Sequence, residues 1–330
     1  MPRVGVMKVL LALGGNAMTA ADGSATPQAQ ITAITTAMES VAALVAEGHE
    51  VVLTHGNGPQ VGNILVKNEL AARVVPPVPL DWCGAQTQGT IGFVAMNALE
   101  AALARRGAEA PVAALVTRTL VDADDPGFTH PTKPIGRYLP REEAEHLVEH
   151  GQTWEDRGER GWRRVVASPE PLEVLETTTI RTLVESGHVV VAAGGGGIPV
   201  VRDPSGGLRG VEAVIDKDLT AALLAAALEV DALVIATDVD HALLDHGTAT
   251  ARPIGRVSVA EMEAHAAAGQ FASGSMGPKV EAALRFARAG GRSIITSLER
   301  ILEAVDGNAG TVISGSSASD SSVAPGPIEA

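Results

Sequence analysis

Short apolar runs alternate with amphipathic segments along most of this chain, and this alternation constrains its fold more than any other feature. Between the first two runs, apolar residues recur at helical spacing, from Ile31 and Ile34 to Met38 and Val41. Apolar strands that alternate with amphipathic helices pair in parallel, and the helices cover both faces of the sheet. The pattern therefore predicts an α/β fold whose buried strands lie at residues 9–13, 50–53, 112–116, 189–192, 233–236 and 293–296.

Two stretches interrupt this alternation. Residues 122–137 contain Pro126, Pro131 and Pro134 and are unsuited to a central strand or helix. Long insertions in compact domains often form lids or binding loops, so we expect residues 122–168 to leave the main sheet as a flap. Residues 314–330 are rich in serine, glycine and proline without periodicity, which predicts a disordered tail with no catalytic part.

The formal net charge of −14 and the single cysteine restrict the function. An acidic chain is a poor candidate for a duplex nucleic-acid binder, which needs a basic face, although it can still contain a local basic pocket. One cysteine, Cys83, excludes an internal disulfide framework and a cysteine-rich zinc site. The first 13 residues lack the basic region of a signal peptide, and Glu229 and Asp231 interrupt the apolar stretch 221–236, which does not span a membrane. We expect a cytoplasmic protein that binds neither nucleic acid nor membranes.

Three of the predicted strands run directly into glycine-rich turns. In a parallel sheet the carboxyl ends of the strands share one edge, where ligands bind. Glycine lets backbone N–H groups close around an anion. One such cluster is more often only a tight turn, but three at equivalent places favour a site for phosphate or another small anion. The turns are Gly14-Gly15-Asn16, His55-Gly56-Asn57-Gly58 and the run from Gly194 to Gly197, and neither the P-loop nor the dinucleotide fingerprint is present.

Three lysines have distinctive neighbours in a chain that contains few lysines. Lys133 lies between prolines of the flap, Lys217 lies between two aspartates, and Lys279 follows a proline at a predicted helix start. Phosphoryl transfer needs cations around the moving group because its charge spreads over the oxygens. Asp216 and Asp218 flank Lys217 and could orient it. Each lysine alone is more often a solvated surface charge, although these neighbours favour a site.

Two further features leave alternatives open. Thr237 and Asp238 follow the fifth strand, where they could meet a ribose or a metal, or could form a cap or turn. His55 lies on a candidate loop and either contacts a ligand or holds the turn. The histidines form no His-x-x-x-His pair, so a metal hydrolase has little support.

Several longer sequence motifs match those of a known family and occur in the same order along the chain. They are ALGGNA (12–17), HGNGPQVG (55–62), PLD (79–81), TQG (87–89), PTKPIG (131–136), GWR (161–163), GGGGIPVV (194–201), VEAVIDKD (211–218), GSM (274–276), PK (278–279) and ITSL (295–298). In these motifs the chain resembles the carbamate kinases, a branch of the amino acid kinase family, over residues 9–313.

The resemblance implies a three-layer αβα sandwich around an open, mostly parallel sheet of about eight strands, with a protruding subdomain where we expect the flap. It implies a lobe at residues 1–210 that binds carbamate or carbamoyl phosphate, and a nucleotide-binding lobe at residues 211–313. The implied reaction is ATP + carbamate = ADP + carbamoyl phosphate, with Mg²⁺ bound mainly through the nucleotide phosphates. Family members are commonly homodimers, and in fermenting organisms the reaction usually forms ATP at the end of arginine deimination.

The resemblance also assigns roles to residues at matching positions. Lys217 and Lys279 are expected to flank the phosphoryl group, with Asp218 organising them and Lys133 reaching the nucleotide phosphates. Carbamate is already an anion, so catalysis needs alignment and charge neutralisation rather than a general base. The residues expected around the carbamoyl group and the transferred phosphate are Gly14, Gly15, Asn16, Gly56, Asn57 and Gly58, with Gly195 and Gly196 in the same cleft and Thr237, Asp238 and Met276 at the nucleotide.

Some positions distinguish this chain within the family it resembles. Ala12 stands where kinases of acetylglutamate, aspartate or uridylate usually place a lysine, a charge that Lys133 and Lys217 would supply. His241 replaces a common aromatic, and Ser273 and Arg137 each replace a common proline. The alternatives are a kinase of another small carboxylate, disfavoured by Ala12; a non-catalytic sensor of nucleotide or carbamoyl phosphate, disfavoured by the lysines; and a dehydrogenase, which lacks its fingerprint.

Overall fold

The computed structural model describes residues 5–19, 26–149, 151–272 and 275–315, and a sheet of eight strands runs through it. The strand order is β15-β17-β16-β12-β1-β2-β9-β3, and every neighbouring pair is parallel except β16 and β17. All six predicted strands belong to this sheet, which confirms the α/β class. The strands are β1 (Lys8–Leu13), β2 (Glu50–His55), β3 (Val112–Ala114), β9 (Val189–Val191), β12 (Ala232–Thr237), β15 (Arg256–Ser258), β16 (Arg292–Ser297) and β17 (Thr311–Ser314).

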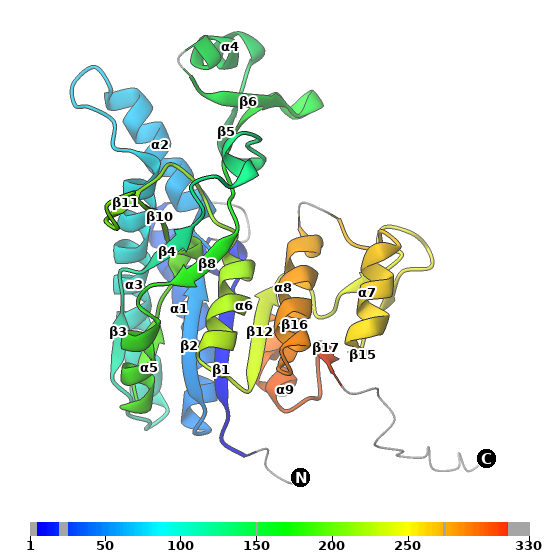
Figure 1. The fold of residues 1–330 in the computed structure, drawn as a ribbon. Coiled ribbons are helices and arrows are strands. Elements are labelled where there is room, and N and C mark those ends of the chain that lie inside the picture. The colour runs from blue at the N-terminus through cyan, green and yellow to red at the C-terminus, as the bar shows by residue number, and fades with distance from the viewer. Residues whose placement is uncertain (1–4, 20–25, 150, 273–274, 316–330) are drawn as a thin grey trace.

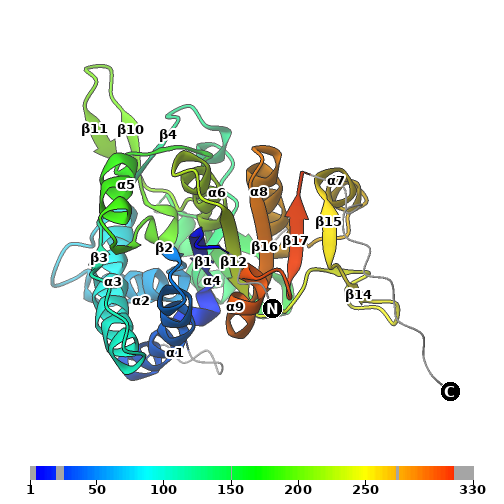
Figure 2. The ribbon, with the colours of Figure 1, turned by 90° about the horizontal axis from the view of Figure 1, so that it is seen from below.

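Helices cover both faces of the sheet and complete the three-layer sandwich (Figures 1 and 2). The side chains of β1 alternate between the faces: Leu11 and Leu13 join one core cluster, whereas Leu10 and Ala12 join the other. This alternation is why strands buried on both faces read as continuous apolar runs. One cluster includes α1 (Pro27–Ala46), α3 (Leu80–Arg105) and α9 (Ile301–Val305), and the other includes α5 (Thr177–Glu185), α6 (Lys217–Ala227), α7 (Val259–Ala267) and α8 (Met276–Arg288).

Helix α1 alone among the described residues is long and apolar enough to cross a membrane by length and composition. Six of its residues are buried, and its apolar stripe packs against α3 and the sheet. That packing is the arrangement of a core helix.

A small subdomain stands beyond the carboxyl ends of the strands, where we predicted the flap (Figure 1). Its three-stranded sheet has the order β5-β7-β6, and its own small core contains Leu139, Ala144 and Trp154. Helix α2 (Gly58–Ala71) packs against β5 and so connects the subdomain to the main body. The elements of the subdomain are β5 (Lys133–Leu139), α4 (Arg141–Glu149), β6 (Thr153–Asp156) and β7 (Trp162–Val166).

Two smaller sheets were not predicted. A four-stranded sheet with the order β11-β10-β4-β8 joins the subdomain to the main sheet, and its strands are only three to five residues long. The strands are β4 (Arg118–Val121), β8 (Pro171–Val174), β10 (Ile198–Arg202) and β11 (Leu208–Gly210), and a separate pair consists of β13 (Leu243–Leu244) and β14 (Arg252–Pro253). Of the predicted tail, Ser314 ends β17 and residues 316–330 lie outside the described residues, as do Ser273 and Gly274.

Candidate active site

The first two glycine turns meet at the carboxyl edge of the sheet because β1, β2 and β12 are neighbours. Gly14 donates its N–H to the carbonyl of Ala236 at 3.0 Å, and Gly56 donates to that of Leu13 at 3.0 Å. The turns are so close that a Cβ on Gly56 would lie 3.2 Å from the backbone nitrogen of Gly15. Asn16 follows in a single helical turn, η1 (Gly15–Met18). The two turns therefore form one continuous backbone surface.

The third glycine turn packs against the second so closely that side chains do not fit. A Cβ on Gly194 would lie 2.4 Å from Nε2 of His55, and one on Gly195 would lie 2.1 Å from Nδ2 of Asn57. Gly195 also has a φ of +67°, which favours glycine. Buried side chains of Thr54, Gln88 and Thr119 donate to the carbonyls of residues 193, 194 and 196, which fixes the turn.

His55 holds its turn, which decides between the two roles left open by the sequence. Its side chain is buried, and its Nδ1 lies 3.0 Å from the carbonyl oxygen of Gly56. Because a carbonyl only accepts, Nδ1 carries the proton of the neutral ring. Burial lowers the pKa of His55 to about 4, so the ring is neutral at pH 7. His55 lines neither of the cavities described below.

Asp218 lies between two of the three predicted lysines. Its carboxylate accepts from Nζ of Lys217 at 2.5 Å and from Nζ of Lys279 at 3.1 Å, and its side chain is 5% exposed. Burial raises the pKa of Asp218, but the two lysines outweigh burial and lower it to about 2. Burial lowers the pKa of Lys217, which Asp218 partly opposes. Lys217, Lys279 and Asp218 therefore form a largely buried triad in which the cations outnumber the anion.

Asp216 connects the third lysine to the same helix. One of its carboxylate oxygens caps α6 by accepting from the N–H of Asp218 at 2.9 Å, and the other accepts from Nζ of Lys133 at 2.7 Å. The ion pair joins residues 83 positions apart and anchors the subdomain to the main body. Asp216 thus pairs with Lys133, while Asp218 makes the direct contact with Lys217.

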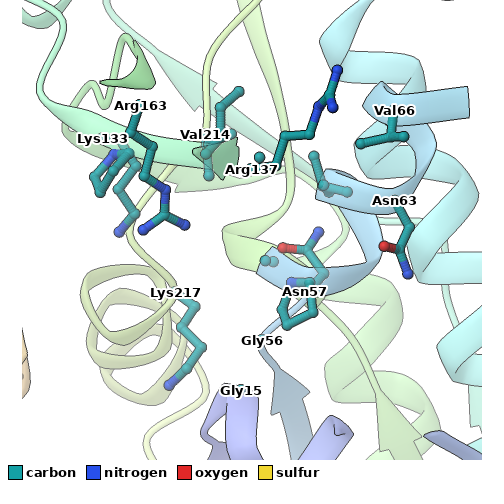
Figure 3. Close-up of a pocket in the computed structure, with 18 of the residues that line it drawn as sticks. Gly15, Gly56, Asn57, Asn63, Val66, Lys133, Arg137, Arg163, Val214 and Lys217 are labelled. Carbon is teal, nitrogen blue, oxygen red and sulfur yellow. The ribbon is translucent and has the colours of Figure 1, made fainter. Parts of the chain in front are cut away.

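Two adjoining cavities open at these turns and lysines, and Figure 3 shows the first of them. Cavity 1 has a volume of about 510 Å³ and lies under the subdomain. Cavity 2 has a volume of about 780 Å³ and lies over the ends of β1 and β12. Both are lined by Gly15, Lys133 and Lys217. Of the other predicted residues, cavity 1 is lined by Gly56, Asn57, Gly58 and Gly195, and cavity 2 by Gly14, Asp218, Thr237, Asp238 and Lys279.

Apart from Asn16, whose side chain lies outside the described part of the structure, two predicted residues line neither cavity. Gly196 is buried behind the third turn, where a Cβ would lie 2.7 Å from the carbonyl oxygen of Ile215. Met276 packs against the core beneath α8. Sequence reasoning missed other lining residues, of which Arg163 and Arg137 in cavity 1 and Glu299 in cavity 2 are charged. Arg163 belongs to the GWR motif (161–163), but the local sequence does not show on which face of the strand its side chain lies.

Helix starts add to the positive character of both cavities. Helices α2 and α6 begin at residues that line cavity 1, and α8 begins beside Lys279 in cavity 2. The first N–H groups of a helix lack partners within the helix, and its dipole favours anions there. The arrangement can hold two anionic ligands end to end, with Lys133 and Lys217 where they meet. That geometry suits transfer of a phosphoryl group from one ligand to the other.

Comparisons with known proteins agree with this geometry. The model of the amino acid kinase family matches residues 7–297. The carbamate kinase-like protein YqeA of Escherichia coli (strain K12) is 45% identical, and the carbamate kinase of Pyrococcus horikoshii is 44% identical; each match covers 93% of this chain and 98% of the relative.

Solved structures give the same result. The carbamate kinase of Giardia lamblia bound to AMP-PNP superposes with a TM-score of 0.88 at 42% identity, over 94% of this chain and 98% of that one. An N-acetylglutamate synthase from Neisseria gonorrhoeae, at 15% identity and a TM-score of 0.54, shares the fold alone. The chain therefore belongs to the amino acid kinase family, and its similar relatives there include carbamate kinases.

Proposed function

We propose that the protein is a carbamate kinase, which catalyses ATP + carbamate = ADP + carbamoyl phosphate. The observation that carries the proposal is the meeting of two cavities at Gly15, Lys133 and Lys217. A phosphotransferase with two substrates needs two sites that share the transferred group, and cations where they join. The similarity to carbamate kinases over 93% of the chain indicates that the acceptor is carbamate.

In this proposal cavity 2 binds the nucleotide and cavity 1 binds carbamate or carbamoyl phosphate. Thr237 and Asp238 line cavity 2 at the end of β12, and Lys279 lies beside them. All three glycine turns border cavity 1, where their backbone suits a small planar anion, and the first turn also borders cavity 2. The similar Giardia lamblia enzyme has been solved with AMP-PNP and, separately, with citric acid, so that protein accepts a nucleotide and a carboxylate.

The chemistry is alignment and charge neutralisation. Lys217 and Lys279 flank the phosphoryl group as it moves, and Asp218 positions them. Lys133 neutralises charge from the opposite side and ties the subdomain over the site through Asp216. Carbamate attacks as an anion and needs no general base, which is consistent with His55 being buried outside the lining of both cavities.

Magnesium enters this scheme with the nucleotide as part of the substrate. Among the residues that the structure describes, no three His, Cys, Asp or Glu side chains come together to hold a metal. The carboxylates of Asp216 and Asp218 are already engaged by lysines and a helix cap. Hard cations such as Mg²⁺ are often held by substrate phosphates with one or two carboxylates, and Asp238 and Glu299 are the further carboxylates lining cavity 2.

The proposal extends to the setting of the enzyme. The protein works in the cytoplasm, in the direction of ATP formation, as the last step of arginine catabolism. It is a homodimer, and large apolar side chains support an interface near α1 and α3: Phe93 is 58% exposed and Ile31 is 40% exposed, and both border a groove between α1, α2 and α3. Sedimentation at micromolar concentration tests the dimer.

A coupled assay tests the reaction. Purified protein receives ADP, Mg²⁺ and carbamoyl phosphate, and the ATP formed is read; a panel of acetylglutamate, aspartate, glutamate and UMP with ATP runs alongside. ATP from carbamoyl phosphate with a blank panel supports the proposal. Lys217→Ala and Lys279→Ala should each lower kcat by at least about a hundredfold while the fold survives. Turnover of a panel member alone would show that the protein is a kinase of another acceptor. No turnover of any substrate would favour a non-catalytic sensor.

A further inference from the structure

Thr87, the first residue of the TQG motif, lies on α3 behind the wall of cavity 1. It is 1% exposed and does not line the cavity. Its hydroxyl donates to the carbonyl of Gly84 at 2.7 Å. Because a hydroxyl has only one hydrogen, Thr87 can only accept from any further partner. That partner is the side-chain amide of Asn57, whose Nδ2 donates to the Thr87 hydroxyl at 2.9 Å.

This contact fixes the orientation of the Asn57 amide. Only the nitrogen end of an amide can donate, so the flipped orientation would bring two acceptor oxygens face to face. The third glycine turn confines the same group, since a Cβ on Gly195 would lie 2.1 Å from Nδ2 of Asn57. Asn57 is 7% exposed, so its amide has little room to rotate.

The oxygen end of the same amide, Oδ1, remains available. Asn57 is the N-cap residue of α2, where an asparagine oxygen usually accepts from the first turn of the helix. Here the side chain makes no such cap. Asn57 lines cavity 1, and Figure 3 shows its amide oxygen directed to the side on which Lys217 lies. The fixed amide thus adds a hydrogen-bond acceptor to a cavity whose charged lining, among the described residues, is cationic.

An acceptor at this place can distinguish between ligands of similar charge and shape. Carbamoyl phosphate carries an NH2 group where acetyl phosphate carries a methyl group, and the two molecules are otherwise alike. An N–H can donate to Oδ1, whereas a methyl group would leave this largely buried oxygen unpaired. Sites built to hydrogen-bond an N–H or O–H of a substrate reject analogues that lack it far more strongly than apolar pockets do.

We propose that Thr87 is a positioning residue that makes the site specific for an amino group. By holding Nδ2 of Asn57, it keeps Oδ1 facing the NH2 of the carbamoyl group. The inference rests on the proposed function and adds Thr87 to it. Thr87 touches no substrate and acts only through Asn57. Its loss should therefore reduce turnover of a substrate with an amino group more than turnover of one without.

Thr87→Val tests the inference because valine keeps the size and branching of the side chain and removes only the hydroxyl. Thr90→Val is the matched control. Thr90 lies three residues further along α3, its hydroxyl donates to the carbonyl of Gln86 at 3.0 Å, and it does not line cavity 1. ATP formation from ADP is measured with carbamoyl phosphate and with acetyl phosphate. In Thr87→Val, kcat/KM for carbamoyl phosphate should fall at least about tenfold, while that for acetyl phosphate stays within about threefold.

The ratio of the two kcat/KM values separates specificity from a loss of structure. Partial unfolding leaves this ratio unchanged, because it removes activity on both substrates equally. Thr87→Ser retains the hydroxyl and should keep the ratio within about threefold of the wild type. An unchanged ratio in Thr87→Val, or an equal fall in Thr90→Val, would overturn the proposal.

Binding without turnover separates the inference from the proposed function. Freshly dissolved carbamoyl phosphate and acetyl phosphate are each titrated into the protein without nucleotide, and the affinities are read by calorimetry. The wild type should bind carbamoyl phosphate at least about tenfold more tightly than acetyl phosphate, and Thr87→Val should lose this preference. If the wild type forms no ATP from carbamoyl phosphate yet shows the Thr87-dependent preference, the proposed reaction fails while the inference stands. Equal affinities in the wild type would refute the inference even if the assay supports the reaction.

Discussion

Replacing Asp218 by asparagine removes the negative charge between Lys217 and Lys279 and should destabilise the protein. The pKa of Asp218 falls from the ordinary value of 3.8 to about 2. One pKa unit corresponds to about 1.4 kcal/mol, so its ion pairs stabilise the charged form by roughly 2.5 kcal/mol beyond the cost of burial. Removing one partner of a buried ion pair lowers the free energy of unfolding by about 3–5 kcal/mol. Asparagine keeps one side-chain oxygen that can still accept a hydrogen bond, so we expect Asp218→Asn to lie toward the lower end of that range.

The stabilisation that Asp218 provides depends on pH in a defined direction. The folded pKa of about 2 lies below the unfolded value of 3.8, so the contribution of Asp218 is complete only above about pH 5 and is lost as the pH falls toward 2. The difference in unfolding free energy between wild type and Asp218→Asn should therefore shrink by about 1 kcal/mol between pH 7 and pH 3. Urea denaturation at both pH values measures it.

The same substitution should lower kcat at least about tenfold, because the lysines lose the group that positions them. Glu281→Gln is the control: it also changes a carboxylate to an amide, but in an exposed ion pair with Arg285, where we expect a loss below about 1 kcal/mol. If Asp218→Asn unfolded at the same urea concentration as the control and kept more than half of its turnover, the reasoning about the buried triad would be refuted.

Three further predictions concern the same site. Because burial lowers the pKa of Lys217, its charge is lost at a lower pH than the ordinary 10.5, so kcat/KM should decline on the alkaline side below that pH; a rate that stays flat to pH 10.5 would contradict this. Lys133→Ala loses the ion pair to Asp216 and should mainly raise the KM for ADP, and unaltered kinetics would defeat that role. Gly195→Ala would push a Cβ to 2.1 Å from Nδ2 of Asn57, so kcat should fall at least about tenfold and the melting temperature should drop. Gly89→Ala, at an exposed helical position with open space, is its control and should leave both unchanged or raise the melting temperature slightly.

Local patterns carried much of the architecture. The six apolar runs predicted from the sequence are strands of the main sheet, and the proline-rich stretch does leave it for a subdomain. These features depend on neighbours in the sequence: alternating burial along a strand, helical periodicity, and the missing N–H of proline. The short strands of the second sheet escaped prediction, because runs of three to five residues gain their pairing from distant partners such as Ile198 with Arg118.

The glycine turns and the three lysines were visible in the sequence because each chemical requirement left a local mark: glycine where a Cβ would collide, and lysines beside prolines, glycine or aspartates. Which charges pair was decided only by the tertiary structure. Lys133 meets Asp216 across 83 residues, and Lys279 meets Asp218 across 61. The neutral state of His55 and the position of Arg163 in the lining of cavity 1 also depend on what surrounds them. Charge pairing and burial are properties of groups brought together in space, so the sequence determined the components of the site, while the fold decided which of them touch and which remain free for a ligand.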